Sequence, residues 1–140
     1  MLDSGDELHI DSANADDLTR LHPWFDALAR DLPNAMHHGM RVALEEAVMN
    51  VAMHAYPPNA SGEIMVRLRT CSEAATLLVE DSGPAFDPTR ASFRERPVSL
   101  PDAEPGGLGL PLLRHYCRDI SYTRVGERNR LLMRFPLPAQ

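Results

Sequence analysis

The most regular hydrophobic pattern in the chain runs through residues 36–56 and follows the 3.6-residue period of an α-helix. Asn34 is a candidate N-cap for this helix, and the pair Pro57-Pro58 prevents it from continuing. One stripe of the helix is apolar and is expected to face the core. It contains Met40, Leu44, Ala47, Val48, Val51 and Ala55.

Three polar residues, Glu46, Asn50 and His54, border this apolar stripe at a spacing of four. Residues four apart on a helix lie on the same side, so these side chains form a line along the edge of the core. Glu45 points to the opposite side and is expected to be solvated. Taken alone, Glu46 and Asn50 also fit an ordinary polar helix rim. The remaining motifs are needed to choose between a rim and a site.

The rest of the chain alternates between strand-like and helix-like patterns. Pro23 lies inside the first helical pattern, so that helix either kinks or begins there. The order predicts an α+β fold, a two-layer sandwich in which helices pack on one face of a mixed, mostly antiparallel sheet. In sequence order, we expect a strand at 7–11, a helix through 18–32, strands at 63–71 and 75–81, a helix after 106–110, and a hairpin of strands 120–125 and 131–137 joined across 126–129.

A long segment without periodicity separates the predicted strand at 75–81 from the last helix. Residues 84–105 are rich in proline and polar residues. A loop of this length within a compact domain is usually functional or disordered. We therefore expect a lid at about 84–105.

Two short motifs flank this loop. Asp81 stands at a strand end before Gly83, which is common in turns but also suits a buried carboxylate that accepts a hydrogen bond from a flat, amine-bearing ligand. The glycine run at 106–110 opens a helix. It is either a flexible helix start or a cradle of backbone N–H groups for phosphates. A loop precedes this glycine run. In a dinucleotide-binding fold a strand precedes the glycine motif instead, so the pattern does not indicate that fold.

Composition narrows the class of protein. With 140 residues, 44% hydrophobic and 24% charged, the chain is expected to form one soluble domain over residues 1–140. It has no apolar run of membrane-spanning length, and its polar, acidic start is unlike a signal peptide, so we expect a cytoplasmic protein without a membrane partner. The net charge of −6 argues against nucleic acid as the main partner.

The basic and sulfur-containing residues add two further limits. All 14 basic residues are arginine, so the chain has no lysine for a Walker-type phosphate loop or a Schiff base. The two cysteines lack metal-ligand spacing and are expected to be free thiols.

In this order, the motifs resemble the nucleotide site of the histidine-kinase-like ATPase superfamily, which includes gyrase-type ATPases, histidine kinases and heat-shock chaperones. Within it, the chain is most similar to the small anti-sigma-factor serine kinases. Residues 46–56 fit the box E-A-V-x-N-x-x-x-H-[GA]-Y, residues 81–86 fit D-x-G-x-x-F, and residues 106–110 fit the glycine box. The resemblance covers nearly the whole chain.

This resemblance implies ATP and Mg²⁺ as cofactors and a role for each motif. Asn50 would give an oxygen to Mg²⁺, Glu46 would act as general base on an incoming hydroxyl, and Asp81 would receive the adenine amine. His54 would either pack or contact phosphate. The other implied ATP-binding residues are Gly83, Phe86, Gly106, Gly107, Leu108, Gly109 and Leu110. The arginines that could approach the transferred phosphate are Arg90, Arg94, Arg96 and Arg114.

The resemblance also implies partners. In this family the hydroxyl belongs to a serine of an anti-anti-sigma protein, and the kinase sequesters a sigma factor, usually as a homodimer. The alternative is a nucleotide-gated protein-binding module with little or no kinase activity. The presence of Glu46 favours the enzyme, while the motifs leave the downstream target open.

Overall fold

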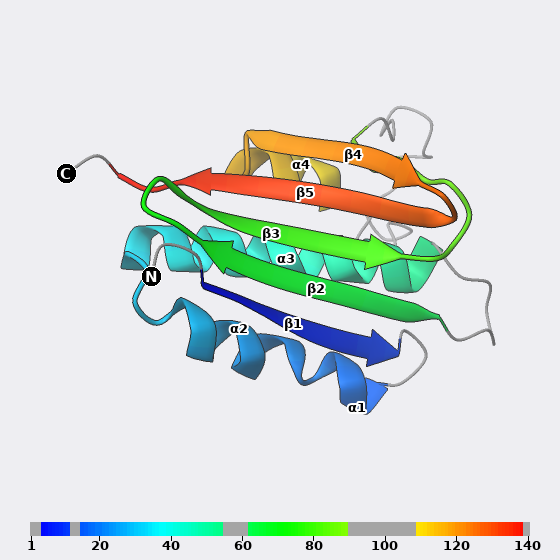
Figure 1. Cartoon of the computed structure of the whole chain (residues 1–140), viewed down its shortest axis with the longest axis horizontal. Helices are drawn as coiled ribbons and strands as arrows, with labels where there is room; N and C mark the ends of the chain where they lie inside the picture. Colours follow the sequence, from blue (N-terminus) through cyan, green and yellow to red (C-terminus); the bar gives the residue numbers. More distant parts are fainter. Residues whose placement is uncertain (1–3, 12–14, 55–61, 90–108, 139–140) are drawn as a thin grey trace, which may run out of the picture.

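A single antiparallel sheet with helices on one face forms the frame of the molecule (Figure 1). This computed structural model describes residues 4–11, 15–54, 62–89 and 109–138. Its strands follow the order β1-β2-β3-β5-β4, and every described pairing is antiparallel. The expected α+β sandwich is confirmed. The elements are β1 (Ser4–Asp11), α1 (Ala15–Leu18), α2 (Leu21–Ala29), α3 (Asn34–His54), β2 (Glu63–Thr70), β3 (Ala74–Asp81), α4 (Gly109–Tyr116), β4 (Asp119–Val125) and β5 (Arg128–Pro136).

The core lies between the sheet and helices α2 and α3. β3 is the middle strand, and all its side chains except Thr76 are buried. The apolar stripe predicted on α3 is buried at its first four positions, while Val51 is half-buried and Ala55 lies outside the described residues. Burial of these side chains is the main driving force for docking α3 on the sheet. Fully buried side chains from both layers meet here, among them Phe25, Met40, Leu44, Ile64, Leu77 and Met133.

Prolines set the starts of the two long helices. α2 begins at Leu21, so Pro23 lies in its first turn, where the missing N–H costs no helical hydrogen bond. α3 begins at Asn34, and the carbonyl of Pro33 accepts the N–H of His37 at 3.1 Å. The prediction of Asn34 as N-cap is therefore wrong, because Pro33 accepts the first helical hydrogen bond and Asn34 already belongs to the helix.

The final hairpin differs from its prediction in one consequential way. The predicted connection covered residues 126–129, but the strands pair up to Val125 and Arg128, which leaves a two-residue turn. Gly126 has a φ of 59°, the left-handed conformation that such a turn requires and that glycine adopts without strain. As a result, Asn129 is a strand residue, paired in register with Asp81.

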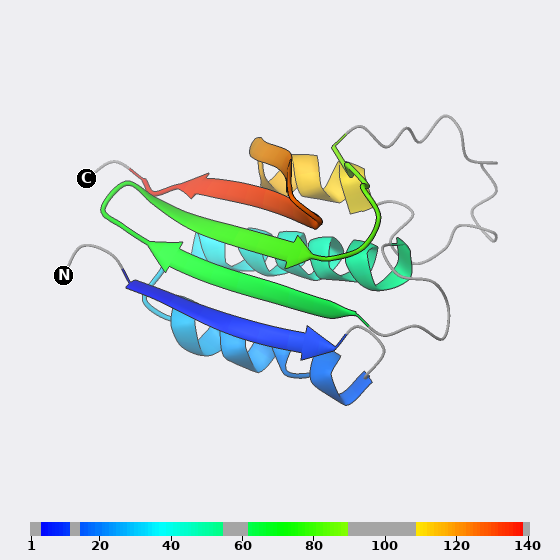
Figure 2. The same cartoon turned by 45° about the vertical axis from the view of Figure 1, so that its right-hand side comes forward.

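α4 lies beside α3 on the helical face of the sheet (Figure 2). Gly39 of α3 is buried against Tyr116, and a Cβ atom at this glycine would come within 2.9 Å of the ring. The close approach of the two helices therefore depends on the absence of a side chain at position 39. The part of the expected lid at 90–105 lies outside the described residues.

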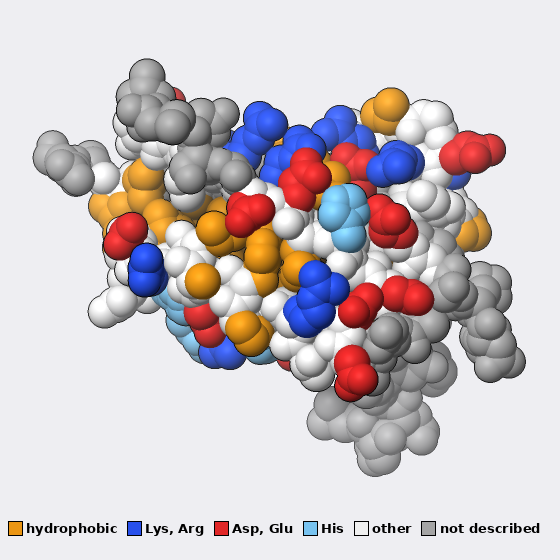
Figure 3. All heavy atoms as spheres, turned by 60° about the horizontal axis from the view of Figure 1, so that its bottom comes forward, with side chains coloured by type: hydrophobic (Ala, Val, Ile, Leu, Met, Phe, Trp, Pro, Cys, Tyr) orange, Lys and Arg blue, Asp and Glu red, His pale blue; other side chains and the backbone are white. Residues whose placement is uncertain are grey.

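The opposite face of the sheet is exposed and carries mixed charges. Basic and acidic side chains interleave along the upper part of the space-filling view (Figure 3). Arg67 is paired with Glu7, while Arg128 and Arg130 both bind the carboxylate of Glu80 at 3.0 and 3.1 Å. The Arg67–Glu7 pair is neutral, whereas Arg128 and Arg130 share one carboxylate and leave one positive charge in excess. Across the described part of the chain, no helix has the length and apolar character needed to span a membrane.

Candidate functional site

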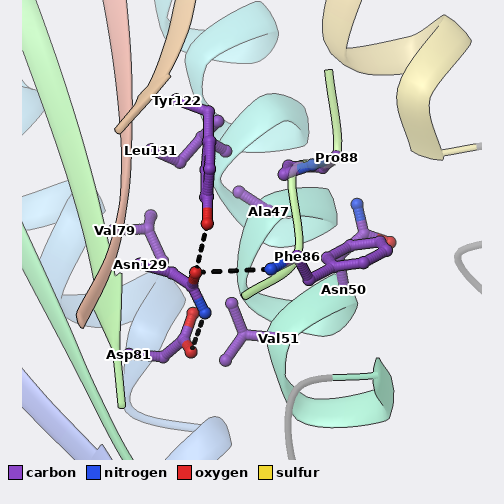
Figure 4. Close-up of a pocket in the computed structure, with 10 residues that line it drawn as sticks. All are labelled: Ala47, Asn50, Val51, Val79, Asp81, Phe86, Pro88, Tyr122, Asn129 and Leu131. Carbon is purple, nitrogen blue, oxygen red and sulfur yellow. Dashed lines mark hydrogen bonds between the residues drawn. The ribbon is translucent and has the colours of Figure 1, made fainter. Parts of the chain in front are cut away.

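A pocket lies where α3, the end of β3 and the β4–β5 hairpin meet (Figure 4). The cavity itself is small, about 20 Å³, and the open space around its mouth brings the hollow to about 330 Å³. Apolar side chains form most of its walls, and polar groups converge on it from all three elements, as is usual for small-molecule sites. Its lining consists of Ala47, Asn50, Val51, Val79, Asp81, Phe86, Pro88, Tyr122, Asn129 and Leu131.

α3 contributes the polar line that its sequence pattern predicted. Asn50 lines the pocket and is only 8% exposed. Glu46 lies one turn earlier, and its Oε2 is buried without a hydrogen-bond partner among the described residues. Burial raises the pKa of the Glu46 carboxyl above its usual 4.5, and the negative charge of Glu45 raises it further. An unpaired buried carboxylate oxygen is costly, and it makes Glu46 a candidate functional group.

Asp81 ends β3 at the sheet side of the pocket and is 6% exposed. Its Oδ1 accepts hydrogen bonds from the Gly83 N–H and from Nδ2 of Asn129, both at 2.9 Å. Within the described residues, Oδ2 receives no hydrogen bond. Asp81 therefore keeps one acceptor oxygen for a ligand while the other is held by the protein.

Asn129 is the site residue that sequence reasoning missed. Because the hairpin turn was predicted to extend to residue 129, this asparagine was assigned to the connection between the two strands. It is instead 4% exposed and in direct contact with Asp81. The alternation of Asn129 with the buried residues Leu131, Met133 and Phe135 is the signal that could have placed it on the inner face of a longer strand.

The structure brings several of the predicted residues together. Asn50, Asp81 and Phe86 line one pocket, and Gly83 is buried beside it. The Phe86 N–H donates to Oδ1 of Asn129 at 3.4 Å, which ties the loop after β3 to the hairpin. The fold therefore brings these residues close together. Their roles in binding a ligand remain predictions.

The other predicted residues are only partly described. His54 is the last residue of α3, and Gly109 and Leu110 open α4. Arg114 donates from Nη2 to the carbonyl of Thr89 at 2.8 Å and so ties α4 to the start of the loop. The remaining predicted site residues lie outside the described residues: Gly106, Gly107, Leu108, Arg90, Arg94 and Arg96.

The chemistry of the pocket suits a flat polar ring with an attached phosphate group. The sheet side offers a carboxylate acceptor between apolar walls, which fits a base with an exocyclic amine. The α3 side offers one amide oxygen from Asn50 and the carboxylate of Glu46. Within the described ranges, no cluster of three His, Cys, Asp or Glu side chains could hold a metal ion. The single amide oxygen of Asn50 suits a cation such as Mg²⁺, which takes few protein ligands and the rest from water and phosphate.

Comparison with known proteins identifies the class that this fold and site define. The family model of the histidine kinase-like ATPase domain matches residues 12–135, so the chain belongs to that family.

Individual relatives agree with the expected branch of that family. The serine/threonine-protein kinase BtrW of Bordetella bronchiseptica is 35% identical over 112 residues, covering 79% of each chain. The serine-protein kinase RsbW of Bacillus licheniformis is 31% identical over 78 residues, covering 53% of this chain and 49% of the relative. An anti-sigma F factor of Clostridium perfringens is 21% identical over 96 residues, covering 68% and 69%. These matches confirm the resemblance to the anti-sigma-factor serine kinases, and two of the three relatives carry the name of the expected enzyme class.

Proposed function

We propose that this chain is an ATP- and Mg²⁺-dependent protein serine kinase that works in a sigma-factor partner switch. The observation that carries the proposal is the convergence of Asn50 and Asp81 on one pocket, with the unpaired buried carboxylate of Glu46 one helical turn away. Residues 1–140 form one ATP-binding domain in this proposal, with a lid at about 84–105 that leads into the glycine box at 106–110.

The base of the nucleotide lies between the apolar walls, with its exocyclic amine donating to Oδ2 of Asp81. Gly83 lets the ring approach the backbone, since a side chain there would occupy part of the space. The phosphates extend toward α3 and the start of α4, where backbone N–H groups at 106–110 favour negative charge. Asn50 holds the Mg²⁺, which when bound offsets the charge on the phosphate oxygens.

Glu46 acts as the general base. It takes the proton from a serine hydroxyl of the protein substrate while the hydroxyl oxygen bonds to the γ-phosphorus and the bond to the bridging oxygen of ADP breaks. The raised pKa of the Glu46 carboxyl makes it a stronger base than a solvated glutamate. Its unpaired oxygen leaves it free to accept that proton.

The proposed partners follow from the relatives. The phosphorylated serine belongs to an anti-anti-sigma protein, the second partner is a sigma factor, and the kinase works as a homodimer in the cytoplasm. The relatives are named as kinases or as an anti-sigma factor, which supports both halves of this switch.

Transfer of labelled phosphate tests this function. The wild-type protein is incubated with γ-labelled ATP, Mg²⁺ and an anti-anti-sigma protein encoded next to it, and label on the serine is measured. We expect transfer by the wild type and at least 100-fold slower transfer by Glu46→Ala, with ATP affinity within about threefold of wild type. Glu73→Ala is the matched control, since Glu73 is exposed in the turn between β2 and β3.

Two outcomes would contradict the kinase mechanism. Normal transfer by Glu46→Ala would remove the general base from it. Binding of ATP without any transfer by the wild type would favour the alternative, a nucleotide-gated module that exchanges protein partners without catalysis.

A further inference from the structure

The side chain of Asn129 is saturated with hydrogen bonds at the centre of the site (Figure 4). Its Nδ2 donates to Oδ1 of Asp81 and to the carbonyl of Pro84, both at 2.9 Å. Its Oδ1 accepts from Nη1 of Arg124 at 3.0 Å and from the hydroxyl of Tyr122. An asparagine amide has two donor hydrogens and one acceptor oxygen, so these contacts engage both of its ends.

These contacts also fix which way the amide faces. Arg124 carries only donors, so the group that faces it must be the amide oxygen. The nitrogen must then face Asp81, whose ionised carboxylate can only accept. Because exchanging oxygen and nitrogen would oppose donor to donor and acceptor to acceptor, Arg124 and Tyr122 hold the NH₂ group of Asn129 against Asp81.

Two of these hairpin residues, Arg124 and Asn129, also bind the loop that follows β3. Nη1 of Arg124 also donates to the carbonyl of Gly83 at 2.8 Å, and Nδ2 of Asn129 lies 3.3 Å from that carbonyl. The hairpin therefore holds both the carboxylate of Asp81 and the backbone of the residues that follow it. We call Tyr122, Arg124 and Asn129 the hairpin clasp.

We propose that Asn129, oriented by Arg124 and Tyr122, is a positioning residue that determines how Asp81 recognises the base. This inference rests on the proposed ATP site. By occupying Oδ1, Asn129 leaves Oδ2 as the only oxygen of Asp81 open to the ligand and fixes the plane of the carboxylate. A base is then selected by whether it has an exocyclic amine at the point that Oδ2 faces. The specificity for the base thus depends on a hairpin residue that need not touch the ligand.

A ligand pair isolates this effect from a general loss of structure. Equilibrium affinities are measured for ATP and for purine riboside triphosphate, which is the same nucleotide without the 6-amino group. We expect the wild type to prefer ATP at least tenfold, the value of a hydrogen bond to a charged group. Asn129→Ala should bind ATP about tenfold more weakly but bind the amine-free analogue within about threefold of wild type.

Two further variants complete the experiment. Tyr122→Phe removes only the hydroxyl that donates to Asn129 and should lower the ATP preference about threefold while the ring still fills the wall of the pocket. It keeps the test open if Asn129→Ala folds poorly, as judged by circular dichroism. Thr123→Ala changes an exposed residue between two clasp residues and should leave both affinities unchanged.

The results separate this inference from the proposed function. If the wild type binds neither nucleotide, the ATP site itself is refuted. If the wild type prefers ATP but the clasp variants weaken both nucleotides equally, Asn129 supports the fold rather than base recognition, and the inference is overturned while the ATP site stands. A selective loss of the ATP preference supports it.

Discussion

Glu46 is a residue whose proposed role as general base is linked to a lower stability of the fold. Its buried, unpaired oxygen and its like-charged neighbour Glu45 raise the pKa of its carboxyl. A carboxyl whose pKa is higher in the folded state stabilises the fold below its unfolded pKa, and this contribution is lost as the pH rises through the folded value. At neutral pH the ionised side chain of Glu46 therefore lowers the stability of the fold. The same ionised form is the one that can take a proton as a general base.

The variant Glu46→Gln tests this cost. Because glutamine has the same shape but no charge, we expect it to raise the free energy of unfolding at pH 7.5 by less than about 1 kcal/mol, since solvent screens the partly exposed carboxylate. The gain should vanish near pH 4, where the wild-type carboxyl is protonated. Urea unfolding at the two pH values measures both. Glu73→Gln is the control: it should show no gain, because Glu73 is exposed in the turn between β2 and β3. Equal stability of wild type and Glu46→Gln at both pH values would contradict this account.

At the scale of residues, the sequence predicts the parts of the site that helical spacing or a motif exposes. Asn50 and Glu46 were placed on one helix edge by their spacing, and the structure finds both buried or half-buried there. Asn129 could not be found in this way, because its role depends on the residue across from it. The pairing of β3 with β5 is a long-range contact. Because the predicted turn at 126–129 was two residues too long, it left Asn129 outside the strand that pairs with Asp81.

At the scale of elements, the contact between α3 and α4 is the most tightly constrained. α4 follows the glycine box at 106–110, so its position on α3 sets where the phosphate-binding end of the proposed site lies. Tyr116 packs on Gly39. Its ring also forms edge-to-face contacts with the rings of His38 and His115, with distances of 5.6 and 4.7 Å between ring centroids. A glycine inside a helix weakens that helix by about 1 kcal/mol relative to alanine. The close approach of α4 accounts for glycine at position 39, because a side chain there would collide with Tyr116.

The substitution Gly39→Ala tests this packing. The added methyl group would lie 2.9 Å from Cδ1 of Tyr116, too close for packed carbon atoms, while its 3.5 Å distance to Cβ is an ordinary contact, so the ring must shift. We expect a loss of about 1–2 kcal/mol in the free energy of unfolding, as the strain outweighs the gain in helix propensity. Urea unfolding measures the change.

A second background provides the control for this prediction. In a Tyr116→Ala protein the ring is gone, so adding Gly39→Ala should now stabilise by up to about 1 kcal/mol through helix propensity alone. If Gly39→Ala were destabilising in both backgrounds, contact with the ring would not be the reason for the glycine.

Periodicity predicted the elements well because each has a buried face of its own. The helix at 36–56 and the strands at 63–71 and 75–81 match α3, β2 and β3 to within a few residues. Boundaries were less predictable where backbone hydrogen bonds rather than burial decide them. Ser4 to Asp6 extend β1 by pairing with β2, and this pairing leaves no mark on the alternation of the sequence.

At the scale of the whole molecule, the order of the elements is enough to predict the two-layer sandwich but not the order of the strands. β5 lies between β3 and β4, so the last strand enters the sheet beside β3 and brings the hairpin clasp to Asp81. β5 has the more apolar inner face, with Leu131, Met133 and Phe135 buried, whereas no side chain of β4 is fully buried. The arrangement is decided by pairing along the full length of β3, which a local pattern does not contain.

Because the proposed site joins α3, β3 and the β4–β5 hairpin, a ligand bound there should stabilise the molecule as a unit. Mg²⁺–ATP at 100 times its dissociation constant adds about 2.7 kcal/mol to the free energy of unfolding, which raises the melting temperature of a domain of this size by roughly 10 °C. One cooperative transition is expected with and without nucleotide. Calorimetry or a fluorescence melt measures both.

Asp81→Asn shows whether this stabilisation passes through the base pocket. With its oxygen held by the Gly83 N–H and Asn129, the new amide would present its NH₂ group to the ligand and oppose the adenine amine. We expect the nucleotide-induced shift to fall to about a fifth of the wild-type value or less, with the fold retained by circular dichroism. Thr123→Ala should keep the full shift. A full shift in Asp81→Asn would instead place the nucleotide away from the pocket, since only ligands that contact this carboxylate can sense its replacement.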